Sequence, residues 1–498
     1  MPFSFFRRTV LAATLCVPVI QASAQPPAAA PDSEPESPAS LLAHAKDAMR
    51  VARIGSSVLH YHAVAAAEQN YQSDRTYPPF FSAMEVKEAW FDPRTGVERM
   101  STETTFPGGG PSPAQITLTD AARAFRADAQ LTILPASSLR ERYLNPWAVV
   151  TDWVAAGNAR FAGREPYRDY SRIVLSRSTA SGEQRLFLDP KTGFPVKLEF
   201  EEPNYLWGQR HIEYVYSNWT LMAGVLLPGS CFRLADGQIE ISQTISHGDV
   251  QAPAGAPSMI LPVQPAQPTD ALPLFLRAID PKIVQLSENS YILSNPGYNE
   301  AVARIGDEVF LFDATQSEDR ARKDAQAIAQ LFPGYKNLTL VVTDLAWPHV
   351  AGVRYWVANG ATVISHRAAR EFLQSVVDRR WTLAPDLLER RRKTARLHFV
   401  GIDAAYQLAG GAVSLHPIDG IGSEVALTAY FTRDRVLWAS DFVQTIEQPA
   451  LYTTEVWRAA QRDGLHPERA AAEHLAVTPW TTIEELVKKD EEGSVAPK

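Results

Sequence analysis

The sequence predicts an α+β protein in two folded parts, with an antiparallel, curved β-sheet domain followed by an α/β layered domain. Three observations support this prediction. Residues 57–250 alternate apolar and polar side chains in short runs between Gly, Pro and Asn turns, which is typical of antiparallel strands. Residues 251–273 contain six prolines and show no period, so we expect an extended linker there. From residue 274 onward, strand patterns alternate with helical patterns.

The N-terminus has the three parts of an export signal. "MPFSFFRR" is basic, "TVLAATLCVPVI" is apolar, and "ASA" at residues 22–24 offers a cleavage site of small residues. We therefore expect a signal peptide over residues 1–24 and a mature protein in the periplasm or outside the cell. Residues 25–40 are rich in Pro, Ala, Ser and Glu, which predicts a disordered tether. Once the signal is removed, Cys231 is the remaining cysteine and cannot form an internal disulfide.

The expected first domain spans residues 41–250 and begins with one helix. "SLLAHAKDAMRVAR", residues 40–53, has helical spacing. Strands follow, and the turn "DPKTG" at residues 189–193 is expected to join two of them into a hairpin. His60 and His62 alternate on one predicted strand and so point to the same face. Two such histidines can bind a metal, but without a third ligand nearby in the sequence a structural role is favoured.

The expected second domain spans residues 274–498. Helical patterns cover residues 317–332, 350–360 and 367–380, and Ser317 is a predicted N-cap. Strand patterns cover residues 282–295, 300–314, 337–344, 361–366, 412–419, 425–432 and 435–442. Such alternation over a long stretch predicts a layered α/β arrangement.

Composition and charge narrow the classes of partner. The chain has 48 basic and 56 acidic residues, for a net charge of −8. Its densest basic run, "RRRK" at residues 390–393, is expected to be a solvated helix end, so a nucleic acid partner is not expected. No segment reaches about 18 uninterrupted apolar residues, so an integral membrane segment is not expected either. We expect a small-molecule substrate or an apolar ligand as partner, while the oligomeric state stays open.

Three segments of the first domain resemble a known family. They are "RLFLDPKTGFPVKLEF", "YVYSNWTLMAGVLLP" and "ADGQIEISQ". Over roughly residues 140–248 they resemble the outer-membrane lipoprotein carrier (LolA-like) domains. The resemblance implies a half-barrel that could hold an apolar ligand.

Four segments of the second domain resemble another family. In chain order they are "ARIGDEVFLFDA", "LTLVVTDLAWPHVAGVRYWVANGATVISHRAAREFL", "LHPIDGIGSEVALTAYFTRDRVLWASDFV" and "AAEHLAVTPWTTIEEL". Their order and spacing over about residues 280–488 resemble the metallo-β-lactamase superfamily of metallo-hydrolases. The resemblance implies an αββα sandwich with a metal site at its mouth.

The family's metal loop reads H-x-H-x-D-H, and its first-metal site takes three histidines. In this sequence none of the three is kept, because Asp344, Ala346 and Ser423 stand at those positions. Pro348 stands at the position of the loop's Asp. Asp344 follows a predicted strand. By its position it is a candidate catalytic residue, either as a further metal ligand or as the base that activates water.

The second-metal site of the family is better preserved. His349 matches the last His of the loop, Asp441 the bridging Asp, and His474 the last His of the site. Three ligands of His and carboxylate type with an open position suit a catalytic Zn²⁺ or Fe²⁺ ion. The sequence therefore predicts at most one metal ion, while loss of the other positions is also compatible with no bound metal.

Two functions remain open from the sequence. The first is an exported metallo-hydrolase with a single metal ion that hydrolyses an ester, lactone or amide through metal-activated water. The second is a non-catalytic periplasmic binding protein, a pseudoenzyme that uses its half-barrel for an apolar ligand. The two differ in whether a metal is bound by His349, Asp441 and His474.

Overall fold

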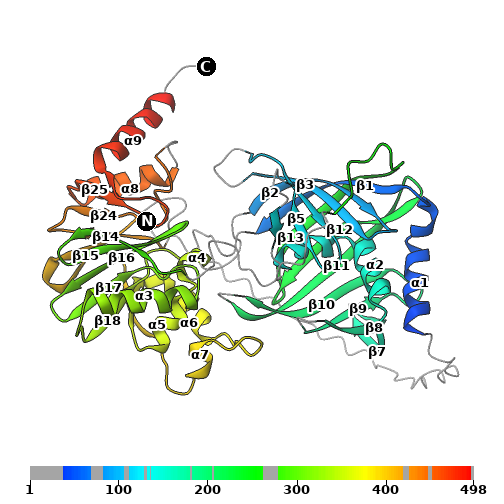
Figure 1. The fold of residues 1–498 in the computed structure, drawn as a ribbon, viewed down its shortest axis with the longest axis horizontal. Coiled ribbons are helices and arrows are strands. Elements are labelled where there is room, and N and C mark those ends of the chain that lie inside the picture. The colour runs from blue at the N-terminus through cyan, green and yellow to red at the C-terminus, as the bar shows by residue number, and fades with distance from the viewer. Residues whose placement is uncertain are drawn as a thin grey trace, which may run out of the picture. The chain divides into compact units, whose positions relative to one another are not determined.

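The computed structural model describes residues 37–68, 82–105, 111–127, 132–134, 136–179, 182–204, 207–261, 279–418, 425–446 and 451–494 (Figure 1). The predicted signal peptide, residues 25–36 of the predicted tether and Ser423 lie outside these residues, as does part of the predicted linker. None of the helices in the described ranges is long and apolar enough to cross a membrane.

In the N-terminal part, the described strands form one 13-stranded antiparallel sheet. Its order is β6-β5-β4-β3-β2-β1-β13-β12-β11-β10-β9-β8-β7, so two meanders meet where β1 pairs with β13. The bounds are β1 Val58–Glu68, β2 Ser82–Asp92, β3 Val97–Thr105, β4 Gln115–Thr119, β5 Ala124–Arg126, β6 Thr132–Leu134, β7 Arg160–Tyr167, β8 Tyr170–Thr179, β9 Gly182–Leu188, β10 Pro195–Asn204, β11 Gly208–Met222, β12 Val225–Ala235 and β13 Gln238–Gln251. The predicted antiparallel strands are confirmed, while closure into a half-barrel stays a prediction.

The hairpin predicted at "DPKTG" joins β9 to β10. Asp189 accepts hydrogen bonds from the main-chain N–H groups of Lys191 and Thr192 through Oδ1, at 2.9 Å each. Gly193 has φ 76°, a left-handed conformation that glycine adopts without strain. The turn therefore forms for the local reason that its sequence indicates.

Two helices, α1 (Pro38–Ala48) and α2 (Pro146–Ala156), pack on one face of this sheet. Trp147 and Trp153 of α2 are fully buried in that core. The sequence prediction of a single leading helix was wrong, because α2 was missed. Asn145 caps α2 by accepting from Trp147 N, and Pro146 follows as its first residue, which is a recognisable helix start. The first helix was also expected to reach residue 53, but it ends at Ala48 and a 3₁₀ turn, η1 (Val51–Ile54), follows.

The C-terminal part contains two further sheets. The first is mixed, in the order β14-β15-β16-β17-β18-β19-β20, and the second has the order β21-β22-β23-β24-β25-β26. The bounds are β14 Lys282–Ser287, β15 Ser290–Asn295, β16 Tyr298–Ile305, β17 Glu308–Phe312, β18 Asn337–Val341, β19 Thr362–His366, β20 His398–Ile402, β21 Tyr406–Leu408, β22 Val413–Pro417, β23 Leu427–Phe431, β24 Val436–Trp438, β25 Arg469–Ala471 and β26 Thr478–Pro479.

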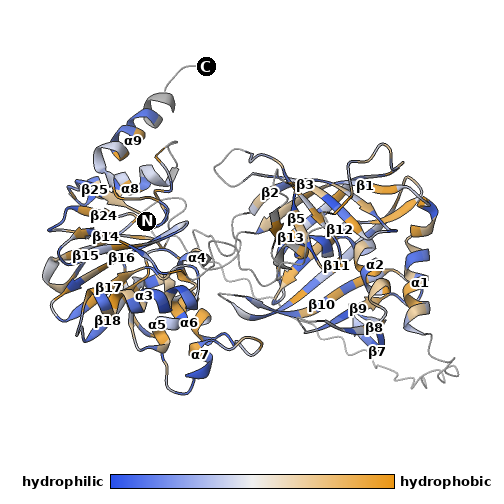
Figure 2. Cartoon of the chain, in the orientation of Figure 1, coloured by the Kyte–Doolittle hydropathy of each residue, from blue (hydrophilic) through white to orange (hydrophobic). Residues whose placement is uncertain are grey.

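The two sheets pack face to face, and helices cover their outer faces. Alternate residues of β17 show this: Phe310 and Phe312 lie in a core shared with β22–β25, whereas Val309 and Leu311 lie in a core shared with helices. Those helices are α3 Glu318–Leu331, α5 Val353–Ala358, α6 Arg370–Asp378 and α7 Leu387–Arg390. On the other sheet, α8 Leu451–Arg462 and α9 Trp480–Ser494 pack on a third core. Because both of its faces are covered, β17 carries buried hydrophobic residues on both, and Figure 2 colours the chain by residue hydropathy. The α+β class is confirmed.

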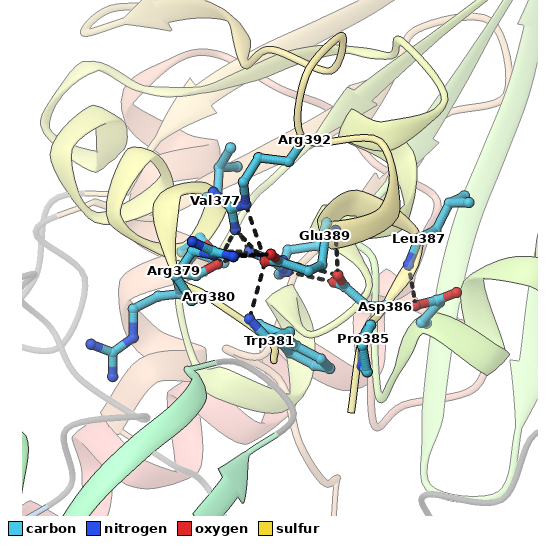
Figure 3. A network of polar contacts seen from close by, with 12 residues as sticks. Val377, Arg379, Arg380, Trp381, Pro385, Asp386, Leu387, Glu389 and Arg392 are labelled. Carbon is cyan, nitrogen blue, oxygen red and sulfur yellow. Dashed lines mark hydrogen bonds and ion pairs between the residues drawn. The ribbon is translucent and has the colours of Figure 1, made fainter. Parts of the chain in front are cut away.

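A polar network joins the helical layer of the first sheet (Figure 3). Asp386 caps α7 by accepting from Glu389 N, and its carboxylate also holds the buried Arg354 of α5 at 2.6 and 3.0 Å. Glu389 accepts hydrogen bonds from Arg380, Trp381 N and Arg392. Burial alone would raise the pKa of Glu389, but these donors lower it from 4.5 to about 2. The basic run at residues 390–393 is therefore partly engaged with the acidic groups of this layer.

Candidate metal centre

The candidate centre lies where β17, β18, β24 and β25 end. Asp313, directly after β17, is fully buried and accepts from Thr343 N at 2.7 Å and from Trp438 Nε1 at 2.8 Å. It has φ 68°, an uncommon conformation for aspartate. Burial raises the pKa of Asp313 to about 6, even though these donors lower it. Asp313 thus accepts hydrogen bonds from residues of both sheets, and we assign it a structural role next to the centre.

The short helix α4 (Trp347–Val350) carries His349 into the centre. Asp344 Oδ1 lies 3.0 Å from His349 Nδ1 and also accepts from Ala346 N. A carboxylate on Nδ1 selects the tautomer with its proton there and turns Nε2 toward the opposite side. Asp344 therefore stands behind His349 and orients it.

Four ligand-type side chains meet on the far side of His349. Its Nε2 lies 2.7 Å from Glu473 Oε2 and 3.8 Å from Asp441 Oδ1, and His474 Nε2 lies 3.0 Å from the same Asp441 oxygen. One ligand atom from each of the four lies within 4.8 Å of the others. His349, Asp441 and Glu473 are buried, and the side chain of His474 is 26% exposed. Solvent therefore reaches the cluster from the side of His474.

His474 and Glu473 are held in place by the turn between β15 and β16 and by the first residues of β16. His474 Nδ1 donates to Gly297 O at 2.6 Å, which leaves Nε2 directed at Asp441. The ring of Tyr298 packs 4.8 Å from the ring of His474. Asn299 N donates to Glu473 O at 2.7 Å, and Asn299 Nδ2 donates to main-chain carbonyls on either side of the Glu-His pair. In both histidines, therefore, Nδ1 is held by a hydrogen bond and Nε2 faces the other ligand-type side chains.

The charges of the cluster fit a cation. Burial by itself would lower the pKa of His349, but the carboxylates of Glu473, Asp441 and Asp344 hold it well above its usual value. Burial also raises the pKa of Glu473 well above its usual value. Neither oxygen of Glu473 accepts a well-aligned hydrogen bond from a donor in the described residues. An ion that replaced the proton on His349 Nε2 would take over from the imidazolium as the positive partner of this buried carboxylate, so the donor set fits a Zn²⁺ or Fe²⁺ ion.

The structure brings together three of the residues singled out from the sequence, His349, Asp441 and His474. Asp344 is adjacent but does not face the cluster. Ala346 offers no ligand atom, and nothing is described for the Ser423 position or the Pro348 side chain. Sequence reasoning missed Glu473. The signal available was an acidic residue directly before a candidate ligand, but on a regular strand that neighbour would point away. Whether the cluster binds a metal stays a prediction.

Comparison with known proteins gives fold-level likeness only. No protein-family model matches the chain, and no curated protein matches it. Similar solved structures include the DIM-1 metallo-β-lactamase, 13% identical, with a TM-score of 0.35, covering 44% of this chain and 100% of that one. The TMB-1 structure is 13% identical, with a TM-score of 0.34, covering 43% of this chain and 99% of that one. A metallo-β-lactamase from Erythrobacter litoralis is 15% identical, with a TM-score of 0.33, covering 43% and 98%. Because these TM-scores are low, the layer order described above rests on the sheets and cores of this chain.

Proposed function

We propose that this chain is an exported metallo-hydrolase-like protein that holds one divalent ion on His349, Asp441, Glu473 and His474 and hydrolyses an ester, lactone or amide. The observation that carries the proposal is the convergence of these four side chains, with both Nδ1 atoms tied back and both Nε2 atoms facing inward. The order of the family-like segments in the sequence supports the metallo-β-lactamase assignment, and the basic, apolar and "ASA" segments support export.

In this proposal each residue has a defined task. His349 and His474 bind through Nε2, while Asp344 and the Gly297 carbonyl orient their rings. Asp441 and Glu473 supply negative charge, with Glu473 on the fully buried side. A bound Zn²⁺ or Fe²⁺ ion would supply Lewis acidity toward a carbonyl and toward water. Substrate would approach from the side of His474, where the cluster meets solvent.

The site is proposed to hold one ion. A second ion in the manner of the family would need ligands at Asp344 and Ala346. Asp344 Oδ1 is already engaged by His349 Nδ1 and Ala346 N, and an alanine side chain has no donor atom. For the same reason we assign Asp344 as a positioning residue for His349 and not as the base.

Metal analysis of protein purified without chelator tests the proposal. His474→Ala should lower the ion content by about one per chain, and chelation should abolish hydrolysis of the ester, lactone or amide that the wild type accepts. His416→Ala is a suitable control, because His416 is buried in the same domain and pairs with Asp463 and Ser414. Equal ion content in wild type and His474→Ala would overturn the assignment of the site.

A second candidate function is a binding protein that uses the N-terminal sheet, which its LolA-like segments support. One cavity of about 390 Å³ lies among β2–β6 and η2 (Ala136–Leu144). Its lining includes Thr102, Thr117, Glu98, Arg126 and Arg142. Such a lining favours a polar ligand, in contrast to the apolar ligand expected from the sequence. Mass spectrometry of small molecules released on denaturation would test this. Recovery of a fatty acid or other lipid would contradict the polar-ligand inference.

A further inference from the structure

A second group of ligand-type side chains lies on the N-terminal sheet, far in sequence from the first. The strand register places Asp249 of β13 opposite His60 of β1. It places His62 of β1 between His247 of β13 and Glu88 of β2. Cross-strand neighbours point to the same face of a sheet. Three histidines and two carboxylates therefore share one face, opposite to the face on which Tyr61 and Ala63 join the core beneath α1 and α2.

Three of these side chains are close enough to share one ion. Glu88 Oε1 lies 3.0 Å from His60 Nε2 and 3.8 Å from His62 Nε2. The two imidazole rings meet edge to face with centroids 4.8 Å apart. In a tetrahedral site with bonds near 2.0–2.2 Å, ligand atoms are separated by roughly 3.3–3.6 Å. The three atoms lie within 4.8 Å of one another, so shifts of less than about 1 Å would close them around an ion.

His60 is already oriented for this task. Its Nδ1 lies 3.1 Å from Asp249 Oδ1 and 2.8 Å from Gln251 Nε2, and these two contacts hold the ring with Nε2 facing Glu88. Trp90 stacks on the same ring at a centroid distance of 5.0 Å. The side chain of His60 is 7% exposed, so its orientation is set by packing as well as by hydrogen bonding. A carboxylate–histidine pair behind the ligand nitrogen is the arrangement that supports imidazole ligands in metal sites.

The other two ligands face solvent. The side chains of His62 and Glu88 are 43% and 41% exposed, so an ion can enter without opening the sheet. The ring of His247 lies 6.0 Å from the ring of His62, within reach of a rotamer change that would add a fourth ligand. Imidazole-rich sites select Zn²⁺ and its neighbours over Mg²⁺ and Ca²⁺.

A third cluster on the same sheet has similar ligand-type side chains but differs in its neighbouring cation. Glu199, His211 and Glu213 also lie within 4.8 Å of one another. There, however, Lys197 Nζ contacts both glutamates, at 2.5 and 3.0 Å, so a protein cation already occupies the position between them. In the His60 cluster, Glu88 forms its ion pairs within the described ranges with the two histidines.

We propose that His60, His62 and Glu88 form a surface site for a Zn²⁺-type divalent ion, with Asp249 as the positioning residue for His60. The site is independent of the C-terminal cluster, because it shares no residue or strand with it. It is exposed and exchangeable, and open coordination positions face solvent.

Zinc titration of chelator-treated full-length protein tests this proposal by calorimetry. His62→Ala should remove one binding event and Glu88→Gln should weaken it by more than about tenfold. His211→Ala, taken from the Lys197-occupied cluster, should change neither stoichiometry nor affinity. His474→Ala should leave the event intact, so that failure of the C-terminal site and failure of this one are distinguishable. Identical titrations for wild type and His62→Ala would overturn the proposal.

Location is checked separately by diethyl pyrocarbonate labelling read out by peptide mass spectrometry. Added Zn²⁺ should protect His62 from modification and leave His211 reactive, while Mg²⁺ should protect neither. Because His62 is exposed on the sheet surface, its replacement is not expected to disturb folding, and far-UV circular dichroism checks that point. Equal labelling of His62 with and without Zn²⁺ would count against the site.

Discussion

The substitution Glu473→Gln distinguishes a metal-binding role of Glu473 from a role as an ion-pair partner of His349. Glu473 is fully buried, its Oε2 lies 2.7 Å from His349 Nε2, and no well-aligned donor in the described part of the chain satisfies it. Glutamine has nearly the same shape and keeps one oxygen, but it removes the charge. If Glu473 is a ligand, Glu473→Gln should weaken metal binding strongly while the metal-free protein stays folded.

The expected size follows from the number of ligands. Structural zinc sites with four ligands bind with about 10–16 kcal/mol, so one ligand in four contributes about 2.5–4 kcal/mol, or roughly 100-fold or more in affinity. Loss of 100-fold in affinity would remove about 2.7 kcal/mol of metal-dependent stabilisation at a saturating concentration of zinc. In the metal-free state His349 keeps Asp344 and Asp441 as partners. The loss in the free energy of unfolding of the metal-free protein should therefore be smaller than the roughly 3–5 kcal/mol expected when an isolated buried pair is broken.

The assay is chemical unfolding with and without zinc. Reference and variant both carry His62→Ala, so that the second proposed site does not contribute. Glu468→Gln is the matched control, since Glu468 is an exposed glutamate just before β25 that pairs with Arg435. Zinc affinity of Glu473→Gln within about threefold of the reference would refute the ligand role. A loss of about 3–5 kcal/mol in the presence of chelator, with no zinc response in either protein, would instead identify a buried ion pair without a metal function.

Three further predictions concern neighbouring groups. Asp344→Asn should weaken zinc binding by about 10–100-fold, because it alters the partner that orients His349, and an unchanged titration would contradict the positioning role. Asp386→Ala should destabilise the C-terminal part by about 3–5 kcal/mol in urea unfolding, since it leaves the guanidinium of Arg354 buried without its carboxylate, and a loss below about 1 kcal/mol would contradict this. The pKa of Glu389 is lowered from 4.5 to about 2, so its contribution to the free energy of unfolding is present above pH 4.5 and is lost as the pH falls toward 2. Glu389→Gln should therefore be less stable than wild type by about 1 kcal/mol at pH 6, and the difference should vanish near pH 2.

Local patterns were sufficient for many elements because strand and helix periods repeat over a few residues. The helix expected at residues 317–332 is α3, and Ser317 caps it by accepting from Arg320 N, as predicted. The strand expected at residues 171–178 lies within β8. The pattern at residues 350–360 was predicted as one helix, but it is divided into the end of α4 and the separate helix α5, with Gly352 between them. A Cβ at Gly352 would lie 3.1 Å from Ala314 O, so glycine allows the close approach of that segment, whose carbonyl accepts from Gly352 N at 2.8 Å.

The sequence by itself determined the strand-rich first part, the alternating second part, and three candidate ligands, because each depends on residue type and short-range spacing. The tertiary structure alone decided that Glu473 faces the cluster and that Asp344 does not. The direction of Glu473 depends on main-chain hydrogen bonds with Ser440, just after β24, and with Asn299 of β16. It alone also supplied Glu88 and Asp249 as partners of His60, since residues far apart in the chain become neighbours only when β1 pairs with both β2 and β13. Side-chain direction at a strand end and register across a sheet are set by these long-range contacts, which no local pattern contains.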